Sequence, residues 1–195
     1  APIIALVAVT VWPMLFLVLL PLWAVNKAAS ISRERDYASR HDMLTELPNR
    51  TMMRDELTEA IDIASRTGAR VGVLLMDLNL FKEVNDTLGH QAGDQVLIEF
   101  SNRLAVELES SDVLARFGGD EYAVLVNRNS DREVIQLAQR LVEASRVPFV
   151  LGGFNVVVAA SVGVAPIKLG DTTNDVVRRA DIAMYAAKAQ HTGCE

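Results

Sequence analysis

The pattern of apolar and polar positions divides the chain into an apolar opening segment and a longer remainder of alternating elements. Residues 1–25 contain no charged side chain and no histidine. An apolar run of about 20 or more residues can span a bilayer as a helix. The pattern therefore predicts a transmembrane helix over 1–25, a polar helical linker or stalk over 26–40, and one domain over 41–195.

Features around the apolar segment set its expected orientation. Pro13 and Pro21 are better tolerated in a membrane helix than in a soluble one. A cleavable signal peptide is the alternative, but the run is too long and no basic residue precedes it. Basic residues follow the run, and the positive-inside rule places the domain in the cytoplasm, on the inner face of the cell membrane. The chain opens with Ala inside the run, so we expect that an upstream part is missing.

Helical and strand periodicities alternate through residues 41–195. Apolar residues three and four positions apart predict helices over 51–66, 81–89 and 95–109, from 131 onward, and over 174–189. Apolar runs predict a strand over 70–77 that is buried on both faces, and two hairpins, 113–117 with 122–126 and 147–150 with 154–164. This order predicts an α+β fold, with a central, mostly antiparallel sheet flanked by helices.

Cap residues set the expected helix ends. Pro48 stops the stalk helix, Asn49 or Thr51 can cap the helix that follows, and Gly68 ends that helix. Asp94 is placed to cap the helix over 95–109, and Asp131 to cap the next one. A cap is also the alternative role for Asp94 if it takes no part in a site.

Composition narrows the classes of function. The formal net charge is −6, which disfavours binding to a nucleic acid polymer. An acidic domain that binds a phosphorylated small molecule needs a bound cation or a few placed basic groups. The single cysteine, Cys194, excludes an internal disulfide and agrees with a reducing compartment.

Candidate chemistry lies at the first hairpin and at the end of the central strand. Gly118 and Gly119 permit a tight turn and a close approach of the backbone to a ligand. Asp120 and Glu121 follow, and adjacent carboxylates favour a divalent cation that bridges phosphates. Asp77 closes the central strand, where open α/β sheets bind ligands. The alternatives are a solvated hairpin and a helix cap or solvated strand end.

Four blocks in this order resemble the GGDEF family, the diguanylate cyclases: Asp42–Arg50, Asp77–Asp94, Gly118–Tyr122 and Ala180–Lys188. The resemblance runs from about His41 to Lys188. It implies a fold similar to the polymerase palm and the adenylyl cyclase catalytic domain. It also implies condensation of two GTP into cyclic di-GMP with release of two pyrophosphates, in an antiparallel homodimer that is needed for activity.

The resemblance implies a metal set and a catalytic set. Mg²⁺ or Mn²⁺ would be held by Asp77, the carbonyl of Leu78, Asp120 and Glu121. Glu121 is implied as the proton acceptor, with Asp120 beside it. The catalytic and ligand roles of Asp120 and Glu121 are not separable from the sequence.

The resemblance also implies substrate contacts, and the sequence suggests one structural pair as a hypothesis. Asn85 and Asp94 would read the guanine edge, and the backbone of Gly118 and Gly119 would lie under the triphosphate. Lys82 and Lys188 would contact phosphates. His90 is similar to a substrate-adjacent position, and a packed histidine at a helix end is the alternative. Asp42 and Arg116 are expected to pair and to tie the stalk to the hairpin.

Departures from the family pattern qualify these expectations. Asn79 replaces a frequent Asp, Glu46 a usual Gly, and Tyr122 a Phe. Glu109 stands where members with product inhibition have Arg, so we expect no inhibition at that site. The end lacks the usual Gly-Arg-Asn, and we expect a truncated last strand. The alternative function is a catalytically weak GTP-binding or dimerising module that regulates an attached domain, and a sensor or phosphodiesterase domain is a possible missing neighbour.

Overall fold

A computed structural model describes residues 20, 22–28, 30, 33–128, 130–190 and 193–194. The chain divides into two compact units, residues 1–39 and 40–195. In the first unit, residues 22–28 and 33–39 are helical. The predicted membrane helix over 1–25 falls almost wholly outside the described residues. Among the residues that are described, no helix combines the length and the apolar character needed to cross a bilayer.

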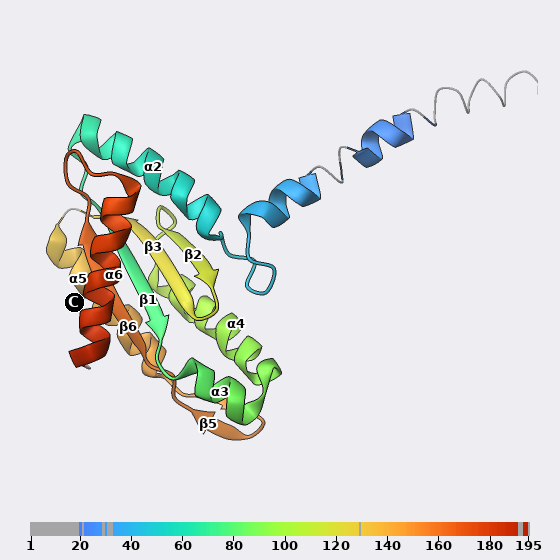
Figure 1. The fold of residues 1–195 in the computed structure, drawn as a ribbon, viewed down its shortest axis with the longest axis vertical. Coiled ribbons are helices and arrows are strands. Elements are labelled where there is room, and N and C mark those ends of the chain that lie inside the picture. The colour runs from blue at the N-terminus through green and yellow to red at the C-terminus, as the bar shows by residue number, and fades with distance from the viewer. Residues whose placement is uncertain are drawn as a thin grey trace, which may run out of the picture. The chain divides into compact units, whose positions relative to one another are not determined.

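The second unit alternates helices and strands as an α+β domain (Figure 1). Its elements in chain order are α2 (Arg50–Thr67), β1 (Val71–Leu78), α3 (Phe81–Leu88), α4 (His90–Glu107), β2 (Val113–Gly118), β3 (Glu121–Asn127), α5 (Asp131–Arg146), β4 (Phe149–Leu151), β5 (Phe154–Val156), β6 (Ala160–Pro166) and α6 (Thr173–Gln190).

The central sheet has the strand order β2-β3-β1-β6, and each neighbouring pair is antiparallel. The prediction of a mostly antiparallel sheet is confirmed. The second predicted hairpin is wrong in its extent, because residues 154–164 do not form one strand. β5 pairs only with β4 in a separate two-stranded ribbon, whereas β6 joins the main sheet beside β1. The split comes at residues 157–159, which belong to neither strand.

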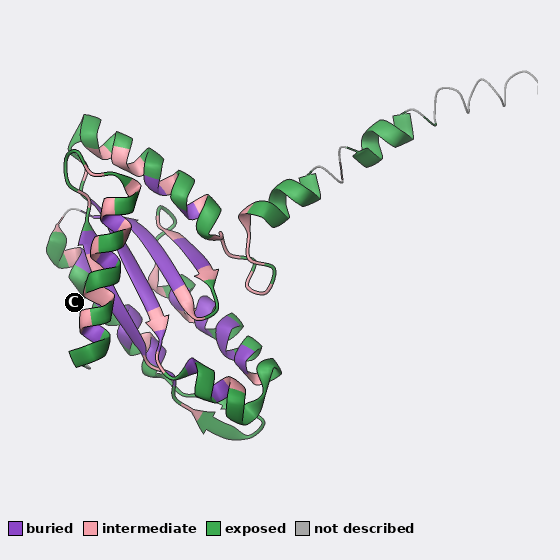
Figure 2. Cartoon of the chain, in the orientation of Figure 1, coloured by how far each residue is buried: buried purple, intermediate pink, exposed green. Residues whose placement is uncertain are grey.

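Two apolar cores lie on opposite faces of the sheet, because successive side chains of a strand point to opposite sides. On β1, Leu74 and Met76 belong to one core, which α3, α4 and α5 complete. Val73 and Leu75 belong to the other core, which α2 and α6 cover. The prediction that β1 is buried on both faces is confirmed, and Figure 2 shows the buried strands between exposed helix surfaces.

The ends of α2 form as the sequence predicts. The side chain of Asn49 accepts hydrogen bonds from the backbone N–H groups of Thr51 at 2.9 Å and Met52 at 3.2 Å. Gly68 closes the helix with a φ of 73°, in the left-handed region that glycine adopts readily. Both contacts satisfy backbone groups that a helix end would otherwise leave unpaired.

Two other predicted caps are wrong. α4 begins at His90 and contains Asp94, so Asp94 does not cap it. Its side chain is therefore available for another role. α5 is capped by Ser130, whose hydroxyl accepts from the N–H of Glu133, and Asp131 is the first helical residue. Polar side chains next to a helix start are interchangeable in a sequence pattern, so the pattern missed each start by one to a few positions.

Candidate active site

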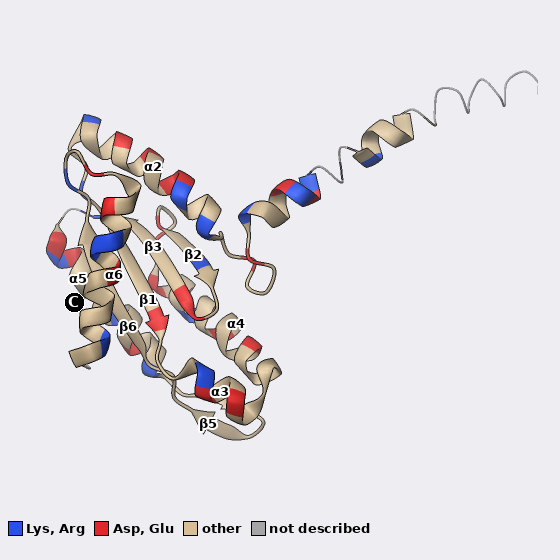
Figure 3. Cartoon of the chain, viewed as in Figure 1, with Lys and Arg blue, Asp and Glu red and all other residues tan. Residues whose placement is uncertain are grey.

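Three carboxylates from two blocks of the sequence meet at one end of the sheet. Asp77 lies near the end of β1 and is the direct cross-strand partner of Glu121 at the start of β3. Directly opposed residues on neighbouring strands point to the same face. The backbone carbonyl of Asp120 accepts a hydrogen bond from the N–H of Leu78 at 3.3 Å. Figure 3 shows the resulting acidic ends of β1 and β3.

The turn between β2 and β3 carries the glycine pair. Gly118 and Gly119 have φ values of 125° and 55°, and a Cβ at either position would meet no atom within 4 Å. The glycines are therefore required by the backbone conformation and not by crowding. Open space above this turn leaves the backbone accessible to a ligand, as the sequence predicts for Gly118 and Gly119.

The pKa of the Asp120 carboxyl group is shifted by its acidic neighbour, Asp77. Partial burial and the negative charge of Asp77 together raise the pKa of Asp120 above its ordinary 3.8. Lys188 and Arg116 oppose this shift but do not cancel it. A carboxylate that a neighbouring carboxylate destabilises in this way belongs to a site that a cation would stabilise.

Basic side chains neutralise the other two acids. The ammonium of Lys188, on α6, forms an ion pair with Asp77. The guanidinium of Arg50 donates to Glu121 at 3.0 Å and lies over the ring of Phe117, 4.7 Å from its centroid. The sequence predicted Lys188 at the site, and the structure places it beside an expected metal ligand. Arg50 was not predicted.

The donor set fits a divalent cation of the magnesium type. Among the described residues, no three His, Cys, Asp or Glu side chains form a ready-made metal cage. Asp77 and Asp120 nevertheless lie close enough for their charges to interact, and the Leu78 carbonyl directly follows Asp77. Mg²⁺ is usually held by one or two carboxylates together with substrate phosphates, and not by an all-protein cage. Glu121 is engaged by Arg50 instead.

The two residues expected to read guanine lie on consecutive helices, α3 and α4. Asn85 lies on α3 and Asp94 on α4, next to Gly93. A Cβ at Gly93 would lie 2.1 Å from Oδ1 of Asn85, so the amide of Asn85 lies directly over this glycine. Because Gly93 has no side chain, the Asn85 amide can lie against it, one position before Asp94 in the sequence.

Lys82 and His90 occupy the ends of the same pair of helices. Lys82 is in the first turn of α3 and His90 is the first residue of α4, and both are exposed. Neither side chain makes a hydrogen bond or ion pair with another described residue. The alternative of a packed histidine at residue 90 is disfavoured by this exposure.

The first of the four sequence blocks, Asp42–Arg50, is held to the β2–β3 hairpin through Arg116. Its guanidinium donates to Asp42 at 2.7 Å, and also to the carbonyl of Gly119 at 2.8 and 3.1 Å. Its backbone N–H donates to the carbonyl of Pro48 at 2.9 Å. The predicted Asp42–Arg116 pair is confirmed. Because Arg116 also contacts the carbonyl of Gly119, the same arginine links this first block to the turn that carries the two glycines.

Asp42→Asn is expected to destabilise the fold in a pH-dependent way. Partial burial alone would raise the pKa of Asp42, but hydrogen bonds from Thr45 and Arg116 lower it below 3.8. A carboxyl with a lowered pKa in the folded state stabilises the protein above its unfolded pKa, and this contribution is lost as the pH falls through the folded value. We expect a loss of about 2 kcal/mol at pH 7, typical of a hydrogen bond to a charged group.

Urea unfolding at pH 7 and near pH 3 measures this effect. The difference between Asp42→Asn and the wild type is expected to shrink in acid, because the wild type then loses its own carboxylate. The matched control is Asp55→Asn, whose partner Arg40 and own side chain are both well exposed. An equal difference at both pH values would contradict the assigned role of Asp42.

At Glu109 and Asp112, where we expect no product inhibition, the carboxylates pair with another arginine of the chain. Asp112 accepts from the guanidinium of Arg128 at 2.7 and 2.5 Å, and its side chain is fully buried. Glu109 lies 3.6 Å from the same guanidinium. The carboxylates therefore already have a basic partner from the same chain. The absence of product inhibition at this position stays a prediction.

A weak signal for the role of Arg50 is present in the sequence. A cation is unfavourable in the first turn of a helix, where the helix dipole is positive, and Arg50 is the first residue of α2. An arginine in such a position suggests a partner elsewhere. The identity of the partner of Arg50 depends on the tertiary fold, because Glu121 is 71 residues away in the sequence.

The fold and the acidic site define an α+β domain with a candidate cation site, and comparison with known proteins identifies its family. The family model described as "Diguanylate cyclase, GGDEF domain" matches residues 39–194 of this chain. The chain belongs to the GGDEF family. This confirms the resemblance carried by the four sequence blocks.

Relatives in Pseudomonas aeruginosa illustrate the likeness. The chain is 39% identical over 163 residues to MucR, a bifunctional diguanylate cyclase/cyclic di-GMP phosphodiesterase, covering 83% of the chain and 24% of MucR. It is 37% identical over 160 residues to the diguanylate cyclase TpbB, covering 80% of the chain and 37% of TpbB. A solved TpbB GGDEF domain is 38% identical, with a TM-score of 0.76, over 79% of this chain and 91% of that one. The chain thus spans well under half the length of these two curated relatives.

Proposed function

We propose that this chain is the diguanylate cyclase part of a signalling protein, and that it condenses two GTP into cyclic di-GMP and two pyrophosphates. The observation that carries the proposal is the meeting of Asp77, Asp120 and Glu121 at one end of the sheet. α3 leaves this end of β1 and carries Asn85 toward Asp94. One chain would bind one GTP, so a second copy has to supply the other nucleotide.

Each half of the reaction forms one bond and breaks another. The 3′-oxygen of one GTP attacks the α-phosphorus of the other, and the bond from that phosphorus to the pyrophosphate oxygen breaks. The hydroxyl proton passes to a carboxylate, and we assign this role to Glu121, at the start of β3. The second half repeats this with the nucleotides exchanged and closes the ring.

The side chains of this chain would position the substrate and balance its charge. Asp77, Asp120 and the Leu78 carbonyl would hold Mg²⁺ or Mn²⁺, which when bound lowers the pKa of the hydroxyl and neutralises the triphosphate. Lys188 would exchange its contact with Asp77 for a phosphate, and Lys82 would approach the phosphates from α3. Gly118 and Gly119 would let the backbone lie beneath them.

Recognition of guanine is assigned to Asn85 and Asp94. A carboxylate accepts hydrogen bonds from the N1–H and N2–H₂ groups of guanine, and an amide pairs with O6 or N3. Adenine presents a different pattern, so a site built for these bonds rejects it. The helical position of Asp94, which does not cap α4, supports this assignment.

Gly93→Ala is expected to weaken GTP binding about tenfold, the loss of one good hydrogen bond. The new Cβ would displace the Asn85 amide, whose Oδ1 lies 2.1 Å from its position. Initial rates against GTP concentration should show a raised KM with kcat little changed. The control is Gln91→Ala, an exposed change in the same helix. An unaltered KM for Gly93→Ala would contradict the assigned role of Asn85.

The setting of the enzyme is part of the proposal. A helix over 1–25 would tether the domain to the inner membrane, with the domain in the cytoplasm, as the basic residues after the run suggest. A homodimer would bring two GTP-loaded sites face to face. A sensor or phosphodiesterase domain would lie elsewhere in a longer protein, and the bifunctional nature of MucR supports this view.

A weak or inactive GTP-binding module is the second candidate. It is favoured by the departures at the end of the chain and by relatives such as NbdA, a cyclic di-GMP phosphodiesterase that is 38% identical over 152 residues. Incubation of the 195-residue chain with GTP and Mg²⁺, followed by chromatography, distinguishes the two. Cyclic di-GMP formed from GTP, with no cyclic product from ATP, supports the enzyme. GTP binding without product supports the module.

A further inference from the structure

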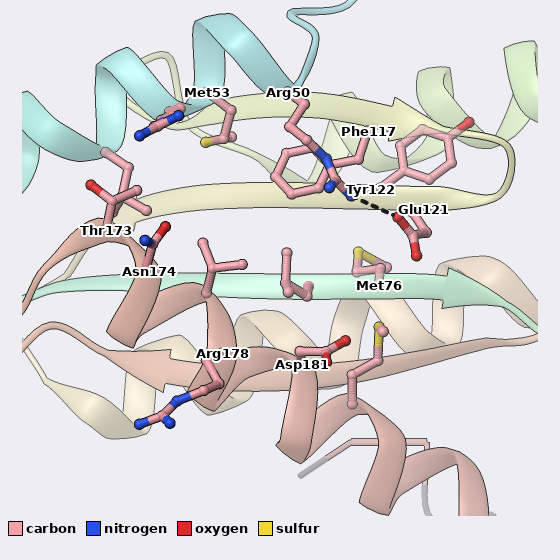
Figure 4. A pocket seen from close by; sticks show the side chains of 15 residues that line it. Arg50, Met53, Met76, Phe117, Glu121, Tyr122, Thr173, Asn174, Arg178 and Asp181 are labelled. Atoms are coloured by element: carbon pink, nitrogen blue, oxygen red, sulfur yellow. Dashed lines mark hydrogen bonds and ion pairs between the residues drawn. The ribbon is translucent and has the colours of Figure 1, made fainter.

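A cavity of about 530 Å³ lies between α2 and α6, on the sheet face that bears Glu121. Figure 4 shows α2 along one side and α6 along the other, with strands of the sheet as the floor. Every lining residue belongs to the unit 40–195. Sites for small molecules typically measure about 300–1,000 Å³, so this cavity has the size of a ligand site.

The walls suit a flat, apolar body. Met53, Leu57, Leu75 and Met76 are at most 6% exposed and line the cavity together with the ring of Phe117. Methionine sulfur is polarisable and packs favourably against aromatic rings. An aromatic ligand therefore finds matching surfaces here.

The rim carries an excess of positive charge. Arg50, Arg54 and Arg178 line the cavity, against two carboxylates, Glu121 and Asp181. The side chains of Arg54 and Arg178 make no hydrogen bond or ion pair with another described residue. In a chain of net charge −6, this local excess indicates an anionic ligand group.

Arg50 connects the cavity to the catalytic acids. Arg50 and Arg54 are four residues apart on α2, so their side chains leave the same face of the helix. Arg50 and Glu121 point toward each other in Figure 4, and Arg50 donates to Glu121 at 3.0 Å. An anion bound between Arg50 and Arg54 would compete with Glu121 for the Arg50 guanidinium.

We propose that this cavity is a regulatory binding site for a flat aromatic anion, which borders the GTP site at Glu121 without overlapping the bound nucleotide, and whose acidic group engages Arg50 and Arg54. When Arg50 turns to the ligand, Glu121 loses the contact that positions it, and kcat falls while KM for GTP stays the same. This consequence for turnover rests on the proposed function, whereas binding does not.

Calorimetric titration of the 195-residue chain with naphthalene-1-sulfonate tests the site. One molecule is expected to bind per chain, and uncharged 1-naphthalenemethanol should bind more weakly. Arg54→Glu should weaken sulfonate binding about tenfold or more, since it replaces an attraction by a repulsion. The control is Arg132→Glu, another exposed arginine without an ion pair to a described residue, on α5, where binding should not change.

A second variant and a competition complete the test. Val177→Trp fills the cavity from α6 and should abolish binding. Because Arg54→Glu leaves the apolar interior intact, its loss of binding would not be explained by misfolding. α,β-Methylene-GTP with Mg²⁺ should not displace the sulfonate. No binding, equal binding by Arg54→Glu and the wild type, or displacement by the GTP analogue would each overturn the proposal. A chain that makes no cyclic di-GMP but binds the sulfonate as described refutes the proposed enzyme and supports the site.

Discussion

Asp77→Asn is expected to slow the formation of cyclic di-GMP by about a thousandfold, the scale on which removal of one key electrostatic group acts in enzymes. Asp77 faces Glu121 across the β1–β3 pair, and its charge contributes to the raised pKa of Asp120. Asparagine keeps the shape but removes the charge, so only one of the two carboxylates assigned to the cation, Asp120, would remain beside the Leu78 carbonyl. Initial rates with GTP and Mg²⁺ measure the effect.

The fold should tolerate this change. The side chain of Asp77 is only 16% exposed, but asparagine keeps its shape, and Lys188, which is 46% exposed, can turn to solvent, so loss of the ion pair should cost little stability. Thermal melting should therefore be almost unaltered. Loss of the negative charge should also lower the pKa of Asp120, which NMR of the carboxyl carbon can follow. The matched control is Asp86→Asn, an exposed carboxylate on α3. Retention of more than about a tenth of the wild-type rate would contradict the role given to Asp77.

Gly163→Ala is expected to destabilise the domain by about 3 kcal/mol or more, at the upper end for overpacking of a core. A Cβ at residue 163 would lie 2.1 Å from both the carbonyl oxygen of Ala180 and the backbone nitrogen of Met184. These atoms belong to α6, which packs on β6. Backbone cannot rotate away as a side chain can, so the helix has to move.

Displacement of α6 has a second consequence. Lys188 lies in the last turn of α6 and pairs with Asp77, so the variant should also lose activity at temperatures where it is still folded. Urea unfolding at pH 7 gives the stability. The control is Gly72→Ala in β1, where the new Cβ would meet Cγ1 of Val134 at an ordinary 3.4 Å. Similar midpoints for the two variants would contradict the close packing of α6 on β6.

Much of the fold was readable from local patterns. The N-cap Asn49 and the left-handed Gly68 define α2, because capping depends on residues adjacent in sequence. The double burial of β1 followed from its unbroken apolar run. The break between β5 and β6 was not readable, because residues 156–160 are apolar throughout. It is set by distant contacts, such as the bond from the Asn79 N–H to the Ala159 carbonyl at 2.7 Å.

The site was predicted in part. The register of β1 and β3 brings together Asp77 and Glu121, which the family resemblance had placed in one site. The engagement of Glu121 by Arg50 could not be read, because it joins the start of one helix to a strand far along the chain. The helical setting of Asp94 was hidden by its likeness to a cap. The membrane helix over 1–25 stays a prediction.

Counting bound Mn²⁺ by electron paramagnetic resonance, with α,β-methylene-GTP present, tests most directly whether the acids form one metal and nucleotide site. The wild type is expected to bind Mn²⁺ tightly only with the nucleotide, and Asp77→Asn and Asp120→Asn should each abolish this binding. Asp86→Asn should bind as the wild type does. Unchanged Mn²⁺ binding in Asp77→Asn and Asp120→Asn would contradict the account.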